Sequence, residues 1–434
     1  METARGKKRL RASHRLHFHE REATVDPMSD TEAPTTAFNP FSPEFRDDPY
    51  PSYRTMRDAG PVIRTPFGPL MVTRYEPVDR VLRSSAFRTP RGYRDANDPA
   101  GPSRFDPAGP LSLHRRHWLL FQSGEAHARL RKLVTKVFTA RAVQTLVPRI
   151  ECLVDALLVP ALERGSMEVI GELAYPLPAT VICELLGVPE GDRGENRAWA
   201  ATIAPTLDPI ATEEQIAAAE AAMRGWDAYT RELMAERRRK PGHALLDDML
   251  AVEEDGTRLT SDEIAANMTF LFLAGHETTT NLIGNGLLAL LRHQDQLAAL
   301  REDPGLVKNA IEEVLRFDSP VQFTARVAVE TTQVEGIEVK AEHPIMLALG
   351  AANHDERRFD AADTLDVRRR DVKPLSFGGG IHYCVGAALA RAEAKAAFER
   401  LVARTGQLAL AERPEWRPGI NLRALTRLPI VLAS

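Results

Sequence analysis

Apolar residues recur at helical spacing over most of the chain, and the longest such segment runs from Ser261 to about Arg292. It is mainly apolar and opens with the capping box Thr260-Ser-Asp-Glu263. Such a helix would be roughly 45 Å long and should therefore cross the core. Residues 140–249 predict one helix after another, interrupted at prolines and including amphipathic helices over 213–224 and 226–239.

Shorter segments toward both ends of the chain have the pattern of strands and turns. Residues 62–65 and 70–73 predict two strands joined by a Pro- and Gly-containing turn. Residues 320–330 and 334–339 predict a small sheet, and 419–432 a terminal strand pair whose tip reaches toward a pocket. The fold class is therefore mainly α with small β-sheets.

The first 36 residues differ from the rest because they show no apolar periodicity and are rich in Arg, His, Glu and Thr. We assign residues 1–37 to a disordered N-terminal extension. Residues 38–434 are assigned to one domain, although length alone favours about three. Between residues 87 and 110 the chain is crowded with Arg, Pro, Gly and Asp, as in a functional or disordered loop.

Composition and charge exclude several classes of protein. The 434 residues include 56 Lys+Arg and 60 Asp+Glu, so the net charge of −4 predicts no affinity for nucleic acid or membrane surfaces. No apolar run reaches the ~18 residues of a membrane span, and the N-terminus lacks the apolar core of a signal peptide. Cys152, Cys183 and Cys384 are too few and scattered for a disulfide framework. We expect a cytoplasmic protein.

A glycine-rich segment, residues 376–386, places Cys384 just before a run of strong helix formers. A helix N-terminus stabilises a thiolate, so we expect the pKa of Cys384 to be lowered. A thiolate so placed is a nucleophile or a metal ligand. The alternatives are an incidental buried cysteine and a Cys/His acyl-transfer site, for which His382 would have to reach the sulfur.

The spacing Phe-x-x-Gly-x-His-x-Cys-x-Gly in this segment resembles the haem-binding loop of the cytochrome P-450 family. It is filled by Phe377, Gly380, His382, Cys384 and Gly386. The resemblance implies a haem b cofactor (iron protoporphyrin IX) with Cys384 as its metal ligand. In that family the axial thiolate pushes electron density onto iron and favours O–O cleavage. The implied fold is a single haem-enclosing domain.

A second motif lies in the middle of the long apolar segment, where Ala274-Gly-His-Glu277-Thr278 breaks the local helix preference. The Thr278 hydroxyl can bond the Ala274 carbonyl and loosen the helix, and the small Ala274 lets a flat ligand approach. A core helix with an ordinary back-bonded threonine would give the same pattern. The order Ala-Gly-x-Glu-Thr resembles the family's oxygen-activation motif, which implies that Glu277 and Thr278 govern proton delivery to dioxygen. We interpret His276 as structural.

Two further motifs follow the family order. His127-x-x-x-Arg131 resembles the pair that grips the haem propionates, and the resemblance adds Arg326 and His382 to that role. Glu313-x-x-Arg316 resembles a buried structural pair that helps to hold the haem loop. Its third member is expected among the arginines Arg368, Arg369 and Arg370, with Arg369 favoured by its spacing from Asp366. His354 stands where the family often has arginine.

The resemblance implies a monooxygenase that inserts one oxygen atom from O2 into a small lipophilic substrate by hydroxylation or epoxidation. The length leaves no room for a fused reductase, so a separate ferredoxin and NAD(P)H-dependent reductase should supply electrons. A basic patch of Arg129, Lys132 and Lys136 is the expected docking face. A peroxide-dependent peroxygenase and a non-catalytic haem-binding sensor stay open as alternatives.

Overall fold

The computed structural model describes residues 33–36, 38–66, 68–90, 105–208, 210–254 and 256–433. Residues 33–434 form one compact unit, to which all that follows refers. Most of the predicted extension, residues 1–32, lies outside the described part of the chain. The unit is mainly helical with small sheets, which confirms the predicted fold class.

The α-helices are α1 (Pro43–Asp47), α2 (Tyr50–Ala59), α3 (Tyr75–Arg83), α4 (Pro110–Arg115), α5 (Gly124–Val137), α6 (Ala140–Arg164), α7 (Pro176–Leu186), α8 (Arg193–Ile203), α9 (Glu213–Arg239), α10 (Leu245–Ala251), α11 (Ser261–Arg292), α12 (Gln294–Glu302), α13 (Val307–Phe317), α14 (Leu349–Ala352) and α15 (Ala387–Arg404). Shorter helical turns are η1 (Leu119–Phe121), η2 (Ile170–Ala174), η3 (Glu190–Asp192), η4 (Ala204–Leu207), η5 (Pro304–Leu306), η6 (Leu375–Phe377) and η7 (Gly380–His382). None of the described helices is both long and apolar enough to cross a membrane.

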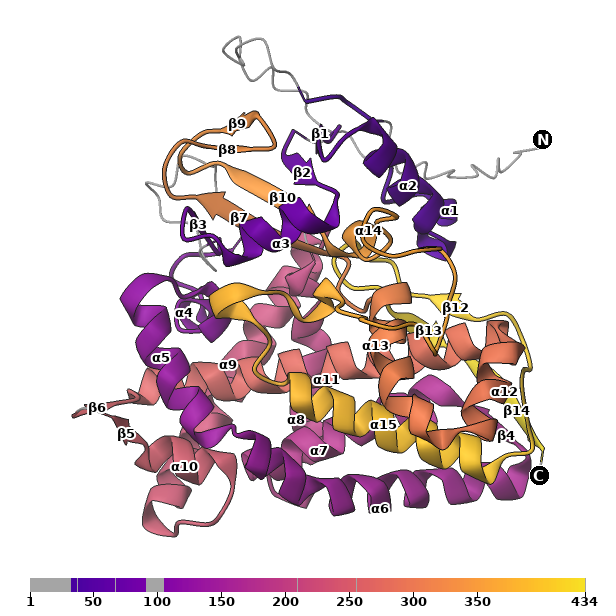
Figure 1. The fold of residues 1–434 in the computed structure, drawn as a ribbon. Coiled ribbons are helices and arrows are strands. Elements are labelled where there is room, and N and C mark those ends of the chain that lie inside the picture. Colours follow the sequence, from indigo (N-terminus) through magenta and orange to yellow (C-terminus); the bar gives the residue numbers. More distant parts are fainter. Residues whose placement is uncertain are drawn as a thin grey trace, which may run out of the picture. The chain divides into compact units, whose positions relative to one another are not determined.

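Helix α11 is the centre of the fold, as its apolar length predicts. The Thr260 hydroxyl accepts from Glu263 N at 3.2 Å, and Glu263 Oε2 accepts from Thr260 N at 2.9 Å, which confirms the capping box. Helices α7, α9, α13 and α15 pack against α11, and α6 lies along α15 (Figure 1). Because most of α11 is buried, a polar interruption in its middle needs a physical reason.

Three of the predicted helix interruptions, at Gly225, Pro148 and Pro160, are wrong. Helix α9 continues through Gly225, where an added Cβ would lie 3.2 Å from Trp199 Nε1, so this glycine admits the neighbouring indole and does not end the helix. Helix α6 continues through Pro148 and Pro160. Its long packing face on α15 offsets the hydrogen bonds that the two prolines remove.

The strands are β1 (Val62–Arg64), β2 (Leu70–Val72), β3 (Phe87–Arg88), β4 (Ser166–Glu168), β5 (Glu253–Glu254), β6 (Thr257–Arg258), β7 (Phe323–Ala328), β8 (Thr332–Val334), β9 (Ile337–Val339), β10 (Pro344–Ala348), β11 (Gln407–Leu410), β12 (Glu415–Trp416), β13 (Leu425–Arg427) and β14 (Pro429–Ala433). The largest sheet has the order β1-β2-β10-β7-β3, with only β2 and β10 parallel. The predicted strands near the N-terminus and after α13 are confirmed. Strands β11, β14 and β4 form a second sheet, while β12–β13, β5–β6 and β8–β9 pair separately.

Arg423, near the C-terminus, connects distant parts of the chain. Its side chain is 8% exposed and donates from Nε to Asp318 Oδ1 at 2.6 Å. Its two terminal nitrogens donate to the carbonyls of Arg46 at 2.8 Å and Asp47 at 3.1 Å. Asp318 also accepts from the Tyr50 hydroxyl at 2.8 Å. This cluster fastens α1 and α2 to the end of α13 and to the C-terminal strands.

The N-terminal edge of the described unit is paired with the sheet. Ala33 and Thr36 are buried, and Arg64 N donates to Pro34 O at 2.9 Å. Thr35 and Arg64 form a parallel bridge. The last residues assigned to the extension therefore contact β1.

Two truncated chains test the role of residues 1–32 and the role of residues 33–37 separately. A chain that begins at Ala33 should keep the thermal midpoint and haem content of the full chain. One that begins at Phe38 loses the Pro34 carbonyl bond and should be less stable by about 1 kcal/mol. Thermal unfolding of the three proteins side by side measures the difference. Equal midpoints for the two truncated chains would show that residues 33–37 do not stabilise the fold, and a lower midpoint on removing 1–32 would give that segment a structural role.

Candidate functional site

The segment between Leu375 and Gly386 is a constrained loop that enters α15. Gly378 and Gly380 have φ of +69° and +63°, which favour glycine. A Cβ at Gly380 would lie 2.5 Å from Leu82 O, so the loop also needs glycine there to pass α3. Cys384 N donates to Phe377 O at 3.0 Å and closes the loop. The glycines thus place Cys384 directly before the N-terminus of α15.

The thiol of Cys384 has an accessible surface although it lies deep within the protein. Burial raises the pKa of the Cys384 thiol above its ordinary value. The backbone N–H groups of Gly386 and Ala387 and the charges of Arg131 and Arg391 lower it, but by less. The expectation of a lowered pKa is therefore wrong for the polypeptide alone, because burial outweighs the helix terminus. The N–H groups and both guanidinium groups still favour the anionic sulfur. The arrangement suits a sulfur that is stabilised by a bound cation.

Basic side chains gather beside this loop from three different elements. His127 and Arg131 lie on α5, Arg326 on β7 and His382 in η7. The rings of His127 and His382 have centroids 4.2 Å apart. Burial, followed by the positive charges of His127, Arg326 and Arg131, lowers the pKa of His382 to about 3. The structure therefore brings together the four residues that the sequence predicts to act together.

This basic cluster has unmet hydrogen-bonding capacity. Nε2 of His127 is buried without a partner. Arg326 is 5% exposed and bonds only Ala325 O at 2.8 Å and Thr324 Oγ1 at 3.4 Å. Burial lowers its pKa to about 10, so it remains charged at neutral pH. Among the described residues neither Arg326 nor Arg131 forms an ion pair with a carboxylate, which leaves the cluster suited to an anionic group from outside the chain.

One face of α11 is open although the helix is otherwise buried. Phe270, Ala274 and Thr278, spaced four residues apart, are partly exposed, whereas most residues around them are buried. Val385, next to Cys384, packs against the same apolar cluster as Phe270. From these exposures we infer a space along this face of α11, on the side of the cysteine loop, and call it the central hollow.

The middle of α11 has the local geometry that the sequence predicts. Thr278 Oγ1 donates to Ala274 O at 2.7 Å. Glu277, 8% exposed, forms an ion pair with Arg417 at 2.9 Å. His276 is fully buried and packs edge-on against Tyr175 with centroids 4.3 Å apart, away from the open face, as expected of a structural residue.

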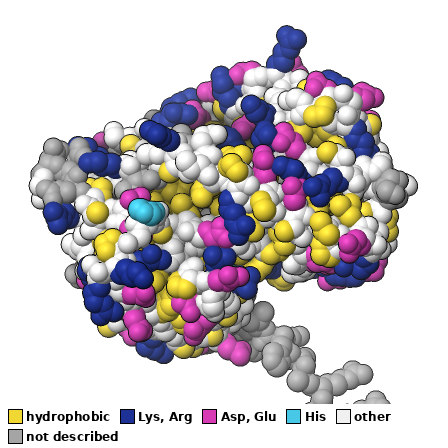
Figure 2. All heavy atoms as spheres, turned by 90° about the horizontal axis from the view of Figure 1, so that it is seen from below, with side chains coloured by type: hydrophobic (Ala, Val, Ile, Leu, Met, Phe, Trp, Pro, Cys, Tyr) yellow, Lys and Arg dark blue, Asp and Glu magenta, His cyan; other side chains and the backbone are white. Residues whose placement is uncertain are grey.

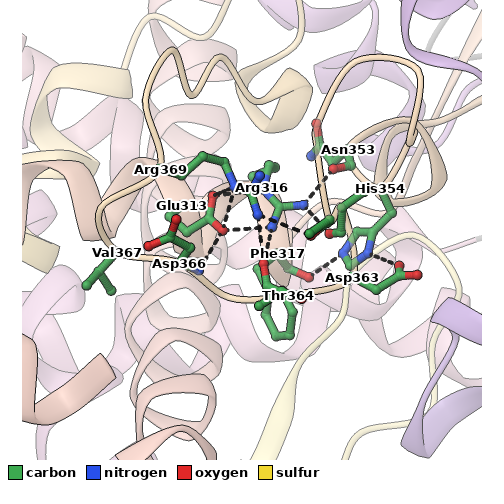
Figure 3. Close-up of polar contacts among 12 residues, drawn as sticks. Glu313, Arg316, Phe317, Asn353, His354, Asp363, Thr364, Asp366, Val367 and Arg369 are labelled. Atoms are coloured by element: carbon green, nitrogen blue, oxygen red, sulfur yellow. Dashed lines mark hydrogen bonds and ion pairs between the residues drawn. The ribbon is translucent and has the colours of Figure 1, made fainter. Parts of the chain in front are cut away.

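Glu313, Arg316 and Arg369 form an ion-pair network whose members come from α13 and from the segment after α14 (Figure 3). Arg316 and Glu313 are both fully buried and joined by two hydrogen bonds of 2.8 and 2.7 Å. Arg369 Nε donates to both oxygens of Glu313 at 3.1 Å, which confirms Arg369 as the third member. Arg368 instead lies 3.9 Å from Glu302.

The network reaches the cysteine loop through Asn353. Arg316 Nη1 donates to the carbonyl of Asn353 at 3.0 Å, and the Asn353 side chain accepts from Leu375 N at 2.8 Å and donates to Ser376 Oγ at 3.0 Å. His354 occupies the position where arginine was expected. It bonds Asp363 at 2.9 Å and Phe317 O at 2.8 Å.

Two ion pairs at the site were not predicted. Arg417, from the β12–β13 hairpin, pairs with Glu277; the only sequence signal was the expectation that a C-terminal turn reaches the pocket. Arg391 on α15 pairs with Glu312 and lies over the Phe377 ring at 4.4 Å. Arg129, expected to face solvent, is half-buried and paired with Glu263.

The family model for cytochrome P-450 matches residues 97–405 of this sequence. The chain belongs to the cytochrome P-450 family.

The relatives it resembles include bacterial enzymes with known reactions. It is 38% identical over 415 residues to a vitamin D(3) 25-hydroxylase of Pseudonocardia autotrophica, covering 93% of this chain and 99% of the relative. It is 38% identical to the biotin biosynthesis cytochrome P-450 of Bacillus subtilis, and the match covers 91% of this chain and 99% of the relative.

Solved structures agree with these relatives. P450BioI in complex with hexadec-9Z-enoic acid ligated acyl carrier protein has a TM-score of 0.84 at 35% identity, covering 90% of this chain and 100% of that one. CalO2 has a TM-score of 0.85 at 35% identity, covering 92% and 99%.

Membership of this family makes the chain a haem-thiolate monooxygenase with haem b as its cofactor. The residues present fit that group. A planar cofactor with two carboxylates matches an accessible cysteine sulfur, a basic cluster without carboxylate partners and an open helix face lined by the small Ala274. A substrate, O2 and a source of electrons are required by any such enzyme.

Proposed function

We propose that Cys384 binds the haem iron and that His127, Arg131, Arg326 and His382 bind the haem propionates. The two arginines do so by charge, and the two histidines, whose pKa values burial lowers to about 4 and 3, do so as hydrogen-bond donors. The observation that carries this proposal is the basic cluster, whose unpartnered His127 Nε2 and carboxylate-free Arg326 lie beside the accessible thiol. Phe377, Gly380 and Gly386 shape the loop, and Ala274 allows the flat cofactor to approach α11. Charge-assisted bonds from arginine to carboxylates support this division of roles.

We further propose that the substrate is a small lipophilic molecule, hydroxylated or epoxidised in the central hollow. The exposed positions along α11 are mostly apolar, and hydrophobic lining with few polar groups is usual for such sites. The hydroxylation of vitamin D(3) by one relative and the fatty acyl group bound to P450BioI support a lipophilic substrate here.

The bound haem supplies the activation of dioxygen, and residues of α11 supply its protons. The Thr278 hydroxyl donates to Ala274 O and lies on the open face, where it can turn toward a small molecule in the hollow. Glu277 Oε2 forms an ion pair with Arg417, whose side chain is partly exposed, so the carboxylate lies in reach of the surface. Glu277 then passes protons from solvent toward Thr278 Oγ1.

Substitutions should separate these two roles. Thr278→Ala should keep haem, substrate binding and NAD(P)H consumption but divert most electrons to hydrogen peroxide, because protons are no longer positioned in the hollow. Glu277→Gln should slow turnover by about 10²-fold, with a larger solvent isotope effect, because the relay loses its acid. Product, peroxide and NAD(P)H are measured together.

Thr280→Ala is the matched control, because Thr280 makes the same back-bond, to His276 O at 3.0 Å, from a buried face of α11. It should leave the ratio of product to NAD(P)H at the parental value. If Thr278→Ala forms as much product for each NAD(P)H consumed as the parent does, Thr278 only packs the helix. Parental turnover by Glu277→Gln would remove the acid from the mechanism.

We propose that electrons come from a separate acidic ferredoxin and its NAD(P)H-dependent reductase in the cytoplasm. Lys132 and Lys136 are exposed on α5, the helix that also bears Arg131, whose Nη2 donates to Tyr383 O at 2.7 Å beside Cys384. A partner docked on α5 would thus approach the cysteine side of the haem. The face shown in Figure 2 mixes basic and acidic side chains without a continuous field of one sign.

Charge reversal tests this docking face. Lys132→Glu and Lys136→Glu should each raise the apparent Michaelis constant for an acidic ferredoxin and leave substrate-binding spectra unchanged. Reduction by the parent should slow as salt rises, because surface charges are screened. Lys340→Glu, on the β8–β9 hairpin side of the sheet, is the control and should have no effect. Reduction that ignores both salt and the α5 substitutions would place docking elsewhere.

A further inference from the structure

Arg115, at the end of α4, is a buried cation whose hydrogen bonds are largely unmet. It is 6% exposed, and its guanidinium lies over the rings of Phe105 at 4.3 Å, Trp118 at 5.5 Å and Phe121 at 5.4 Å. Its one hydrogen bond is a long one of 3.4 Å from Nη2 to Thr206 O. Nε and Nη1 are buried without partners. Burying a charge in this way is unfavourable unless something compensates it.

A second unmet donor belongs to the same cluster. The indole Nε1 of Trp118 is also buried without a partner, and Trp118 is fully buried. Among the described residues, three N–H donors on these two adjoining side chains therefore lack an acceptor. Buried donors are almost always paired in folded proteins, so this concentration points to an acceptor supplied from outside the chain.

The chain's own acid does not meet this need. Glu220 on α9 is the acid whose charge acts on Arg115; its Oε2 accepts from Leu111 N at 3.0 Å, and its Oε1 is buried without a partner among the described residues. Among the described residues Arg115 forms no ion pair with it or with another carboxylate. Burial lowers the pKa of Arg115 to about 10, so the guanidinium is charged at neutral pH.

The two side chains are held rigidly against α11. His114 bonds Thr269 Oγ1 at 3.3 Å through one ring nitrogen and Asp227 at 2.8 Å through the other. Asn267 on α11 donates to His117 O at 2.8 Å and accepts from Leu119 N at 3.0 Å. These bonds fix the backbone on both sides of Arg115 and Trp118, so the donors are positioned before any ligand binds.

The cluster continues directly into the central hollow. Trp118 stacks on Phe270 with centroids 5.4 Å apart, and Phe270 is the first residue of the open stripe that ends at Thr278. Eight residues of α11 separate Phe270 from Thr278, which is about 12 Å along the axis. The donors therefore adjoin the Phe270 end of this stripe, and the proposed reaction site lies at its Thr278 end.

We propose that Arg115 and Trp118 bind the carboxylate of a lipophilic acid substrate whose apolar end extends along α11 toward Thr278. A planar carboxylate matches the guanidinium fork and accepts the indole N–H as well. The rings of Phe105, Trp118 and Phe121 surround the guanidinium, so a small anion with one charge should bind there better than a strongly hydrated anion with two. The inference rests on the proposed function, because it takes the central hollow as the substrate site.

The test uses the haem-loaded protein with three probes of equal chain length: dodecanoate, methyl dodecanoate and 1-dodecanol. Affinities are measured by the shift of the haem Soret band and by equilibrium dialysis of labelled probe. Dodecanoate should bind about tenfold or more tightly than either neutral probe, the usual effect of a charge-assisted bond. Arg115→Gln should abolish this preference without changing the affinity for 1-dodecanol.

Arg116→Gln is the matched control, since it removes a neighbouring positive charge and should retain the preference. Arg115→Lys should retain part of it. If Arg115→Gln fails to incorporate haem, Arg115→Gln combined with Glu220→Gln removes the opposed charges together and provides the comparison. Equal binding of the three probes to the parent, or a preference that survives loss of Arg115, would overturn the inference. Either result with an intact thiolate spectrum leaves the proposed function standing.

Discussion

Replacing Cys384 by histidine is expected to abolish monooxygenase activity and the spectrum that defines this class of enzyme. With thiolate ligation, the reduced, CO-bound parent should show a strongly red-shifted Soret band. Histidine is a neutral ligand that cannot donate electron density as a thiolate does, so Cys384→His should show an ordinary haem-protein band. Product formation should fall to background. Difference spectra and product analysis measure both effects.

Cys152→Ser provides the control, because Cys152 is also an exposed free cysteine but lies on α6. It should retain the red-shifted band and full activity. A histidine-type spectrum in the unmodified protein, or a red-shifted band that survives in Cys384→His, would contradict the assignment of Cys384.

Glu313→Gln is expected to lower the free energy of unfolding strongly. Glu313 is fully buried between the fully buried Arg316 and Arg369. Neutralising the acid leaves two guanidinium groups uncompensated, and breaking a buried pair of this kind costs about 3–5 kcal/mol. Since Arg316 supports the cysteine loop through Asn353, haem should also dissociate more readily. Denaturant unfolding and transfer of haem to an acceptor protein measure the two effects.

Glu399→Gln makes the same chemical change in the half-exposed pair with Lys395 on α15. Such a pair contributes little, so unfolding should be unchanged within error. If Glu313→Gln unfolds like the parent, the network does not stabilise the fold. If it is less stable but keeps its haem, the connection through Asn353 does not support the loop.

Features whose causes are local in the sequence could be predicted. Helix α11 was located at both ends because its capping box and its apolar run lie within the segment itself. The back-bond from Thr278 to Ala274 follows from helical spacing, and Arg369 from its distance to Asp366. The family motifs also concern residues close together in the sequence, so they identified the cysteine loop.

Features that depend on distant segments could not be predicted. Gly225 looked like a helix end because the indole of Trp199 that fills its place belongs to α8. The pKa of Cys384 was predicted from its helix terminus alone, whereas the burial that raises it comes from the whole fold. The residues next to Arg417 and Arg115 in the sequence do not indicate a role for either arginine, because their contacts form only in the folded protein.

The bonds made by Arg423 have a consequence for the order in which the protein is completed during translation. Its acceptors at Arg46 and Asp47 lie 377 and 376 residues earlier in the chain. At ribosomal speeds the first helices must wait roughly 20–75 s for their partner to be synthesised. During that interval the last carbonyls of α1 lack the Arg423 donor, and Asp318, once made, can bond only the Tyr50 hydroxyl within this cluster. The N-terminal segment thus leaves the ribosome first but is among the last to be locked in place.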